Sequence, residues 1–401
     1  MTGGRRIAAL ILLAGVMLID GYDLNAMALA QKYLAPELGL KETDFWVVHS
    51  AVLVGLGIGA LLIAPLGDRF GRKRIIVTGC LVIAVTTLAT ALSASIATFA
   101  IWRLLTGIAL GACLANVSAL SSEIAPEGRR STVMAVVSAG IAIGAMAAGF
   151  TAPELVGWGG WEMLFLVPGG IALMLGIGLA FVLPGNKAAA DGARPASGTK
   201  SGVPLMDLLR PPLAFPLAVF ASTYMINAIA LYMLVSWTPV VLPNAGFDVD
   251  LAVRIQGLLQ GAGLFVSIFL AFLLDRWKPG LTLTIGYLLI GVAFLAIWGT
   301  PADPLSWSIL LLIAGGGITG IHGALMALSP KLFPSTVLSS AIGAAVAISR
   351  IGAIAAPPIG AALIDGGVSP AGYFLSLTIP VGLCVLLTLL IPKVIRKDIR
   401  A

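Results

Sequence analysis

The sequence predicts an all-α membrane protein with twelve transmembrane helices in two pseudo-symmetric bundles of six. Of its 401 residues, 59% are hydrophobic and only 10% are charged, a balance that no water-soluble domain could cover with polar surface. Apolar runs of 18 or more residues recur along the chain, and each can cross about 30 Å of hydrocarbon as a helix. A polar segment near the middle separates two sets of six runs.

The apolar runs place twelve membrane spans in order along the chain. Their predicted ranges are 7–31, 46–66, 75–95, 97–119, 131–153, 161–184, 213–238, 254–274, 280–299, 306–328, 337–363 and 370–392. The first run is interrupted by Asp20 and Asp23 and lacks a small-residue cleavage site, so we expect no cleaved signal peptide. The 48 glycines should serve close helix packing, as in Gly140-x-x-x-Gly144.

Basic residues predict the orientation of these spans. If the N-terminus is cytoplasmic, the only Lys and Arg residues on the external side are Lys32, Lys41 and Arg254. The positive-inside rule therefore predicts a multi-pass protein of the bacterial inner membrane with both termini in the cytoplasm. The net charge of +6 follows from this bias, and no aromatic-interleaved basic patch indicates nucleic-acid binding.

The polar segment 185–212 is rich in Gly, Ala, Ser, Pro and charged residues, so it cannot bury a core. We interpret it as a cytoplasmic linker between an N-terminal bundle, residues 1–184, and a C-terminal bundle, residues 213–401. Repeated halves are a recurrent arrangement in transporters, which bind their substrate near the midplane where the halves meet.

A charged motif follows the second span, and a weaker copy follows the eighth. The first copy reads Gly67-Asp68-Arg69-Phe70-Gly71-Arg72-Lys73-Arg74, and the second reads Asp275-Arg276-Trp277-Lys278. The first copy resembles the loop signature of the major facilitator superfamily, and the resemblance extends over nearly the whole chain. Two positions depart from the pattern, since Ala64 and Lys278 stand where the family has glycine.

Five charged residues at the cytoplasmic side are candidates for gating. Asp68 and Arg69 can form charge-assisted contacts across the cytoplasmic mouth that break when the mouth opens. Arg72 belongs to the same loop, while Glu123 and Arg129 lie at and just after the cytoplasmic end of the fourth span. The alternative interpretation is a solvated positive-inside loop and a solvated helix end.

Further segments are similar to the aromatic acid:proton symporters within the superfamily. These segments are Asp20-Gly-Tyr-Asp23, Arg103-Leu-Leu-Thr-Gly with Asn116 and Glu123-x-x-Pro126, Ser349-Arg350-x-Gly352, and Leu231 to Trp237 with Pro239. The resemblance implies that Asp20 and Asp23 couple protons. It also implies that Arg103 and Arg350 act on the anionic substrate.

The charges inside the first and fourth spans support a link between proton and anion. A charge in mid-bilayer costs at least a few kcal/mol and therefore indicates function. Asp20 lies about 20 Å into the first span, and Arg103 lies about 9 Å below the outer surface, so their depths coincide. If a proton neutralises an aspartate paired with Arg103, the arginine can bind an incoming carboxylate. A permanent structural Asp–Arg pair is the alternative.

Arg350 lies about 20 Å into the eleventh span, and the second half offers it no evident acidic partner. Its planar guanidinium suits bidentate binding of a carboxylate, although backbone carbonyls could satisfy it instead. Other candidates for substrate binding are aromatic, amide or imidazole side chains: Tyr22, Asn116, Tyr224, Asn227, Tyr232, Trp237 and His322. Each could equally serve packing, helix bridging or, for Trp237, the interfacial aromatic belt. We expect His49 to be interfacial.

The leading functional hypothesis is proton-coupled import of a small aromatic carboxylate, such as a hydroxybenzoate- or phenylpropionate-like acid, by alternating access. A transporter of an aliphatic or sugar acid is the alternative, and a drug/proton exporter is disfavoured by the buried arginines. We expect no enzymatic activity, because the two histidines form no constellation with a nucleophile or metal ligands. The expected partners are an organic acid anion, protons and lipid, with no metal or cofactor, and we expect a monomer.

Overall fold

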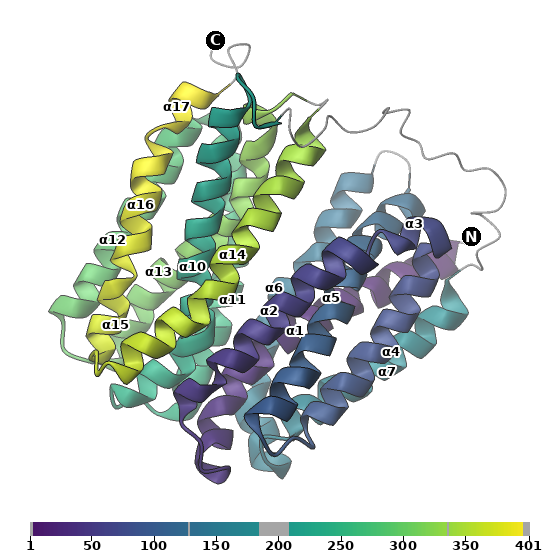
Figure 1. Ribbon diagram of the computed structural model, residues 1–401, viewed down its shortest axis with the longest axis horizontal. Helices are drawn as coiled ribbons and strands as arrows, with labels where there is room; N and C mark the ends of the chain where they lie inside the picture. The colour runs from purple at the N-terminus through teal and green to yellow at the C-terminus, as the bar shows by residue number, and fades with distance from the viewer. Residues whose placement is uncertain (1–2, 127–128, 184–207, 335–336, 396–401) are drawn as a thin grey trace. The chain divides into compact units, whose positions relative to one another are not determined.

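The computed structural model describes residues 3–126, 129–183, 208–334 and 337–395 (Figure 1). These residues contain 12 helices that are long and apolar enough to cross a membrane, which confirms the predicted all-α membrane class. The chain divides into two compact units, Met1–Ala196 and Ser197–Ala401. The predicted linker lies outside the described residues, apart from positions 208–212.

The described part of the first unit contains six long helices and three short ones. The long helices are α1 (Gly3–Glu37), α2 (Trp46–Ile58), α4 (Arg72–Thr90), α5 (Ile96–Ile124), α6 (Arg130–Gly159) and α7 (Met163–Val182). The short ones are η1 (Glu42–Phe45), η2 (Gly59–Ile63) and α3 (Leu66–Phe70). The long helices pack most extensively in three pairs, α1 with α6, α2 with α5 and α4 with α7.

The second unit repeats this plan. Its helices are α10 (Ala214–Asn244), α11 (Val249–Arg276), α12 (Pro279–Gly299), α13 (Pro304–Leu332), α14 (Leu338–Asp365), α15 (Pro370–Ser376), α16 (Thr378–Thr388) and α17 (Ile391–Val394). The extensive pairs are α10 with α14, α11 with α13, and α12 with the last span (α15, α16 and α17 together), and Figure 1 shows α14 alongside α10. In both units, the first span pairs with the fifth, the second with the fourth and the third with the sixth. This shared pairing fits the pseudo-symmetric halves expected from the sequence.

The last span is broken, whereas the sequence predicted one continuous helix over 370–392. The breaks follow Ser376 and Thr388, the last residues of α15 and α16. Each break lies four residues before a proline, Pro380 or Pro392. Because proline has no N–H, it cannot donate the i to i−4 hydrogen bond that would continue the helix through those carbonyls.

The charged motif after the second span is partly helical. The span itself ends in a wider turn, η2, in which the Ala64 N–H bonds to the Gly59 carbonyl at 2.8 Å, five residues back. Helix α3 then ends at Gly71, whose φ of 95° is a conformation that glycine adopts readily. The glycine allows α4 to begin immediately at Arg72.

Side-chain caps define where three helices that carry site residues begin. Ser95 caps α5, Asp248 caps α11 and Asp303 caps α13, each accepting a hydrogen bond from the backbone N–H three residues later. At Asp303 the N–H of Ser306 donates at 2.8 Å, and these hydrogen bonds lower the pKa of the exposed carboxyl. The caps therefore satisfy backbone donors at the starts of these helices.

Glycines bring the paired helices of the first unit into backbone contact. A Cβ built on Gly21 of α1 would lie 1.8 Å from the Ile141 carbonyl oxygen of α6, and one on Gly144 would lie 1.9 Å from the Leu18 oxygen. Between α2 and α5, a Cβ on Gly107 would lie 2.2 Å from the Val52 oxygen. Only glycine fits these contacts, so small residues hold the helices together as expected.

Replacing Gly144 with alanine should destabilise the first unit. The added methyl group must push α1 and α6 apart, because its obstacle is backbone and not a flexible side chain; overpacking of this kind costs about 1–3 kcal/mol or more. The matched control is Gly170→Ala on α7, where a Cβ meets nothing within 4 Å. We expect a lower thermal unfolding midpoint for Gly144→Ala only; equal midpoints for the two variants would contradict the close contact.

Candidate functional site

The first unit buries an ion pair between Asp23 of α1 and Arg103 of α5. Both side chains are fully buried, and Arg103 Nη2 donates to Asp23 Oδ2. Thr87 of α4 donates to the second carboxylate oxygen, Oδ1, at 3.1 Å. The Arg103 guanidinium also lies 5.7 Å from the centre of the Phe165 ring of α7. Four helices therefore meet around this pair.

Arg103 has no exposed surface and is occupied by Asp23, so it can bind a substrate carboxylate only after the pair separates. The depth estimate from the sequence matched Arg103 with Asp20, but the structure pairs it with Asp23, nearly one turn further along α1. Asp20 and Tyr22 are also buried, with 3% and 7% of their surface exposed. A proton-coupling role for Asp20 and Asp23 stays a prediction.

His49 is buried and not interfacial, in contrast to the expectation from the sequence. Only 4% of its surface is exposed, and its Nε2 lies 2.8 Å from Gln31 Oε1 of α1. The hydrogen bond satisfies a polar ring inside the helix bundle, which its position near the end of an apolar run did not reveal.

Asn116 of α5 bridges helices. Its Nδ2 donates to the carbonyls of Ala112 at 2.8 Å and Ala64 at 3.0 Å. A Cβ on Gly67 would lie 1.7 Å from Asn116 Oδ1, so the amide also packs against the start of the charged motif. Of the two roles considered for Asn116, these contacts fit helix bridging.

Arg72 joins two of the other candidate gating residues. Its Nη2 lies 3.0 Å from Asp68 Oδ1, and its Nη1 donates to Glu123 Oε1 at the end of α5. The guanidinium of Arg69 lies 5.4 Å from the centre of the Phe70 ring, and Arg129 is exposed. These contacts lie within the first unit, and the gating role of all five residues stays a prediction.

The second unit gathers Tyr224 of α10, His322 of α13 and Arg350 of α14. The tyrosine and imidazole rings stack with their centres 4.3 Å apart and their planes 12° apart. Arg350 lies within electrostatic reach of both rings and is half-buried. With the residues that the structure describes, its guanidinium makes no hydrogen bond or ion pair. The backbone carbonyls considered as its partners are therefore not found among them.

Asn227 and Tyr287 extend this cluster through hydrogen bonds to His322. The hydroxyl of Tyr287 on α12 donates to Asn227 Oδ1 at 3.0 Å, and Asn227 Nδ2 lies 3.0 Å from His322 Nδ1. Asn227 and Tyr287 are both 1% exposed. We define the anion cluster as Tyr224, Asn227, Tyr287, His322 and Arg350.

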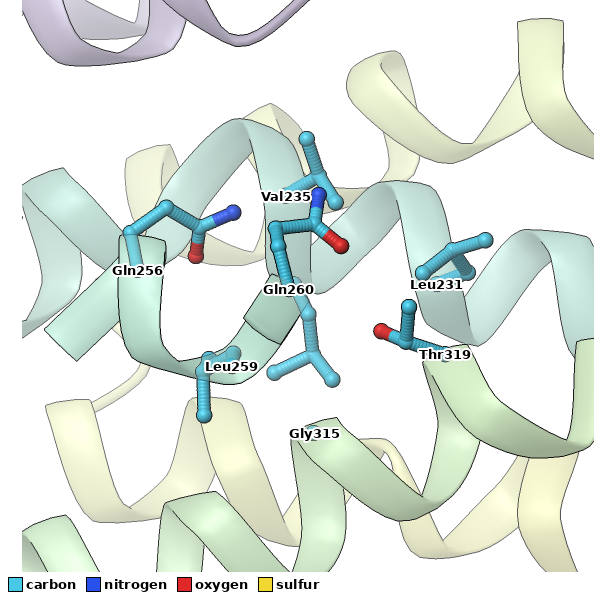
Figure 2. A pocket seen from close by; sticks show the side chains of 8 residues that line it. Leu231, Val235, Gln256, Leu259, Gln260, Gly315 and Thr319 are labelled. Carbon is cyan, nitrogen blue, oxygen red and sulfur yellow. The ribbon is translucent and has the colours of Figure 1, made fainter. Parts of the chain in front are cut away.

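A small pocket lies about one helical turn from the anion cluster. Its lining includes Leu231 of α10, Gln256 and Gln260 of α11 and Thr319 of α13, and Figure 2 shows these side chains around it. Thr319 precedes His322 by three residues and therefore lies on the same face of α13. The space between these side chains is too small to hold a water molecule, so it is a gap in the packing and not a ligand cavity.

The two remaining aromatic candidates differ in accessibility. Trp237 has 0% of its surface exposed, and its Nε1 donates to the Pro357 carbonyl at 3.1 Å. It therefore packs inside the second unit and presents no face to a ligand or to the interfacial belt. Tyr232 is half-buried.

Metal ligands do not cluster in the part of the chain that the structure describes. Within it, no three His, Cys, Asp or Glu residues are placed so that they could hold a metal ion.

The two units each have six membrane spans, and each places a buried or half-buried arginine in a polar cluster. This arrangement defines a multi-pass membrane protein of the secondary transporter class. The family description "Major Facilitator Superfamily" matches residues 11–357. The chain belongs to this superfamily, as the charged motif predicted.

Similar proteins are named as carriers of aromatic acids. The gallate transporter of Pseudomonas putida is 28% identical over 92% of this chain and 88% of its own length. The 4-hydroxybenzoate transporter PcaK of Acinetobacter baylyi is 29% identical, over 91% and 86%. The 3-(3-hydroxy-phenyl)propionate transporter of Escherichia coli is 30% identical, over 89% and 87%. These relatives confirm the predicted resemblance to the aromatic acid transporters.

The fold is also found in solved structures. The crystal structure of a bacterial homolog of the human lysosomal transporter Spinster, in an inward-facing and occupied conformation, matches with a TM-score of 0.81. The match covers 99% of both chains at 16% sequence identity. This likeness shows the fold alone.

Proposed function

We propose that the protein is a proton-coupled importer of small aromatic carboxylates, such as hydroxybenzoate- or phenylpropionate-like acids, working by alternating access. The observation that carries the proposal is the half-buried guanidinium of Arg350, which makes no ion pair in the described ranges and stands beside Tyr224 and His322. A desolvated arginine is stabilised by an anion, and its two donors match the two oxygens of a carboxylate.

Proton coupling is assigned to the buried Asp23–Arg103 pair of the first unit. Protonation of Asp23 would neutralise the carboxylate and weaken its hold on Arg103, which links proton uptake to a change in helix contacts. Asp20, nearly one turn away and 3% exposed, is the second candidate for the same proton.

The substrate class is supported by the relatives, which are named for gallate, 4-hydroxybenzoate and 3-(3-hydroxy-phenyl)propionate. We further propose that the monomer works in a bacterial inner membrane, with both termini in the cytoplasm as the basic residues predict.

Uptake into proteoliposomes tests this function. With the outside more acidic, the protein should accumulate radiolabelled 4-hydroxybenzoate above the level in protein-free liposomes, and a protonophore should abolish the difference. Cyclohexanecarboxylate has the same charge without an aromatic ring and should accumulate much less. Equal accumulation of the two acids would favour the non-aromatic alternative, and extrusion of a cationic dye without acid uptake would favour an exporter.

A further inference from the structure

The orientation of the Asn227 amide in the second unit is determined by its neighbours. The carbonyl oxygen of Ile318 lies 3.4 Å from one amide atom of Asn227, and a carbonyl can only accept a hydrogen bond. That atom is therefore the amino nitrogen, Nδ2. The other amide atom, Oδ1, then accepts from the Tyr287 hydroxyl at 3.0 Å. The Ile318 carbonyl selects this orientation, and the Tyr287 hydroxyl, which can donate or accept, satisfies it as a donor.

This orientation selects one form of His322. Nδ2 carries a second hydrogen, which reaches His322 Nδ1 at 3.0 Å. Since the amide nitrogen donates, Nδ1 must hold a lone pair, and the proton of a neutral imidazole is then on Nε2. A doubly protonated ring could not accept this hydrogen bond.

We propose that Asn227 and Tyr287 hold His322 as the neutral Nε2–H tautomer, so that Nε2–H is the second donor, beside Arg350, to the carboxylate of the substrate. The proposal rests on the proposed function for the identity of the anion. Stacking against Tyr224 fixes the plane of the ring, and the hydrogen bond from Asn227 to Nδ1 fixes its rotation within that plane, so together they fix the direction of Nε2–H. In the described part of the chain Nε2 makes no hydrogen bond, and His322 is half-buried.

The assignment gives the residues of the second unit distinct tasks. Arg350 supplies the charge, and the neutral imidazole adds a directional donor without adding a second positive charge. Asn227 and Tyr287 are positioning residues, because they act on the substrate only through His322. A His322 held in this neutral form does not take up the coupled proton. The proton would then bind in the first unit.

The tautomer is measurable without any ligand. The chain has only two histidines, so protein labelled with ¹⁵N-histidine gives two sets of imidazole signals, and His49→Gln assigns them. Nitrogen chemical shifts in lipid bilayers should show Nε2–H and bare Nδ1 for His322. Tyr287→Phe removes the hydroxyl that donates to Asn227 Oδ1, so that the Ile318 carbonyl alone holds the amide, and a mixture of both tautomers should appear. An Nδ1–H or charged ring in the unaltered protein, or no change in Tyr287→Phe, would overturn the proposal.

Binding of 4-hydroxybenzoate, measured by calorimetry, tests the role of the donor. The side-chain amide of Gln can place a donor near the position of Nε2, so His322→Gln should keep Kd within about 3-fold, whereas His322→Asn should raise Kd by about 10–100-fold. Tyr287→Phe should raise Kd by about 3–10-fold in the native background and not in the His322→Gln background. If Tyr287 had only a structural role, Tyr287→Phe would raise Kd by the same factor in both backgrounds.

The two experiments separate this proposal from the proposed function. If the unaltered protein binds no aromatic or aliphatic carboxylate, the proposed function fails, whereas the tautomer is still decided by the nitrogen shifts. If acids bind but His322→Asn leaves Kd unchanged, the donor role of Nε2 is wrong and the proposed function stands.

Discussion

Neutralising Asp23 is expected to abolish the accumulation of substrate driven by a pH gradient. In Asp23→Asn the side chain keeps its shape but cannot take up a proton, so the pH gradient can no longer drive protonation at this position. Exchange of labelled for unlabelled substrate at equal pH should persist, because it needs no net proton movement. The measurement is uptake and counterflow by the same batch of proteoliposomes.

The Asp23→Asn variant also leaves Arg103 without its counter-ion inside the bundle. Removing one partner of a buried pair costs about 3–5 kcal/mol, enough to prevent folding of a marginally stable protein. The double variant Asp23→Asn with Arg103→Gln removes both charges and should recover most of this stability. It should fold, as judged by thermal unfolding, and still fail to accumulate substrate.

Two further variants sharpen the result. Thr87→Val removes the hydrogen bond to Asp23 Oδ1 without removing the charge, so coupling should survive. Asp20→Asn, tested beside it, shows whether the second aspartate is also required. Undiminished pH-driven accumulation in the folded double variant would rule out Asp23 as the coupling residue.

Replacing Arg350 with alanine is expected to eliminate measurable binding of carboxylates. Charge-assisted hydrogen bonds to a carboxylate contribute about 1.5–3 kcal/mol each, so the loss of two bonds raises Kd by at least about 100-fold. Arg350→Lys keeps the charge but not the planar pair of donors, so its Kd should lie between those of the native protein and Arg350→Ala. Calorimetric titration with 4-hydroxybenzoate measures all three proteins.

Arg276→Ala is a matched control, because it removes the same charge from the same unit. The Arg276 guanidinium lies 4.0 Å from the centre of the Phe272 ring near the end of α11, away from the anion cluster in sequence and on a different helix. Its affinity should match that of the native protein. If Arg350→Ala binds acids as tightly as this control, Arg350 does not hold the carboxylate.

The long helices could be predicted from the sequence because lipid permits few alternatives. A backbone in hydrocarbon must satisfy its own hydrogen bonds, so every long apolar run becomes a helix. The breaks in the last span could not be predicted with the same certainty. Pro380 and Pro392 interrupt it, yet α14 continues through Pro357 and Pro358, so proline alone does not decide the outcome.

The charged residues of the candidate site were found from the sequence, but their partners were not. Span ends are uncertain by about three residues, and three residues rise about 4.5 Å, so depth could not separate Asp20 from Asp23 as the partner of Arg103. His49 and Gln31 are 18 positions apart, and nothing local indicates their hydrogen bond.

Tyr287 was not recognised because a tyrosine inside an apolar run has no distinctive signal. Its role becomes visible only through its hydrogen bond to Asn227, 60 positions earlier, which in turn contacts His322 on a third helix. The sequence marks residues that are costly in lipid, and it does not mark the neutral groups that orient them.

The glycine contacts of the first unit determine which helices the Asp23–Arg103 pair connects. Gly21 and Gly144 bring the backbones of α1 and α6 into contact, and Gly107 does the same for α5 and α2. Rotation of one helix against its partner would therefore make their backbones collide. Asp23 therefore belongs to one interlocked pair of helices and Arg103 to another. If Asp23 binds the coupling proton, as proposed above, its neutralisation would remove the ion pair that joins these two helix pairs.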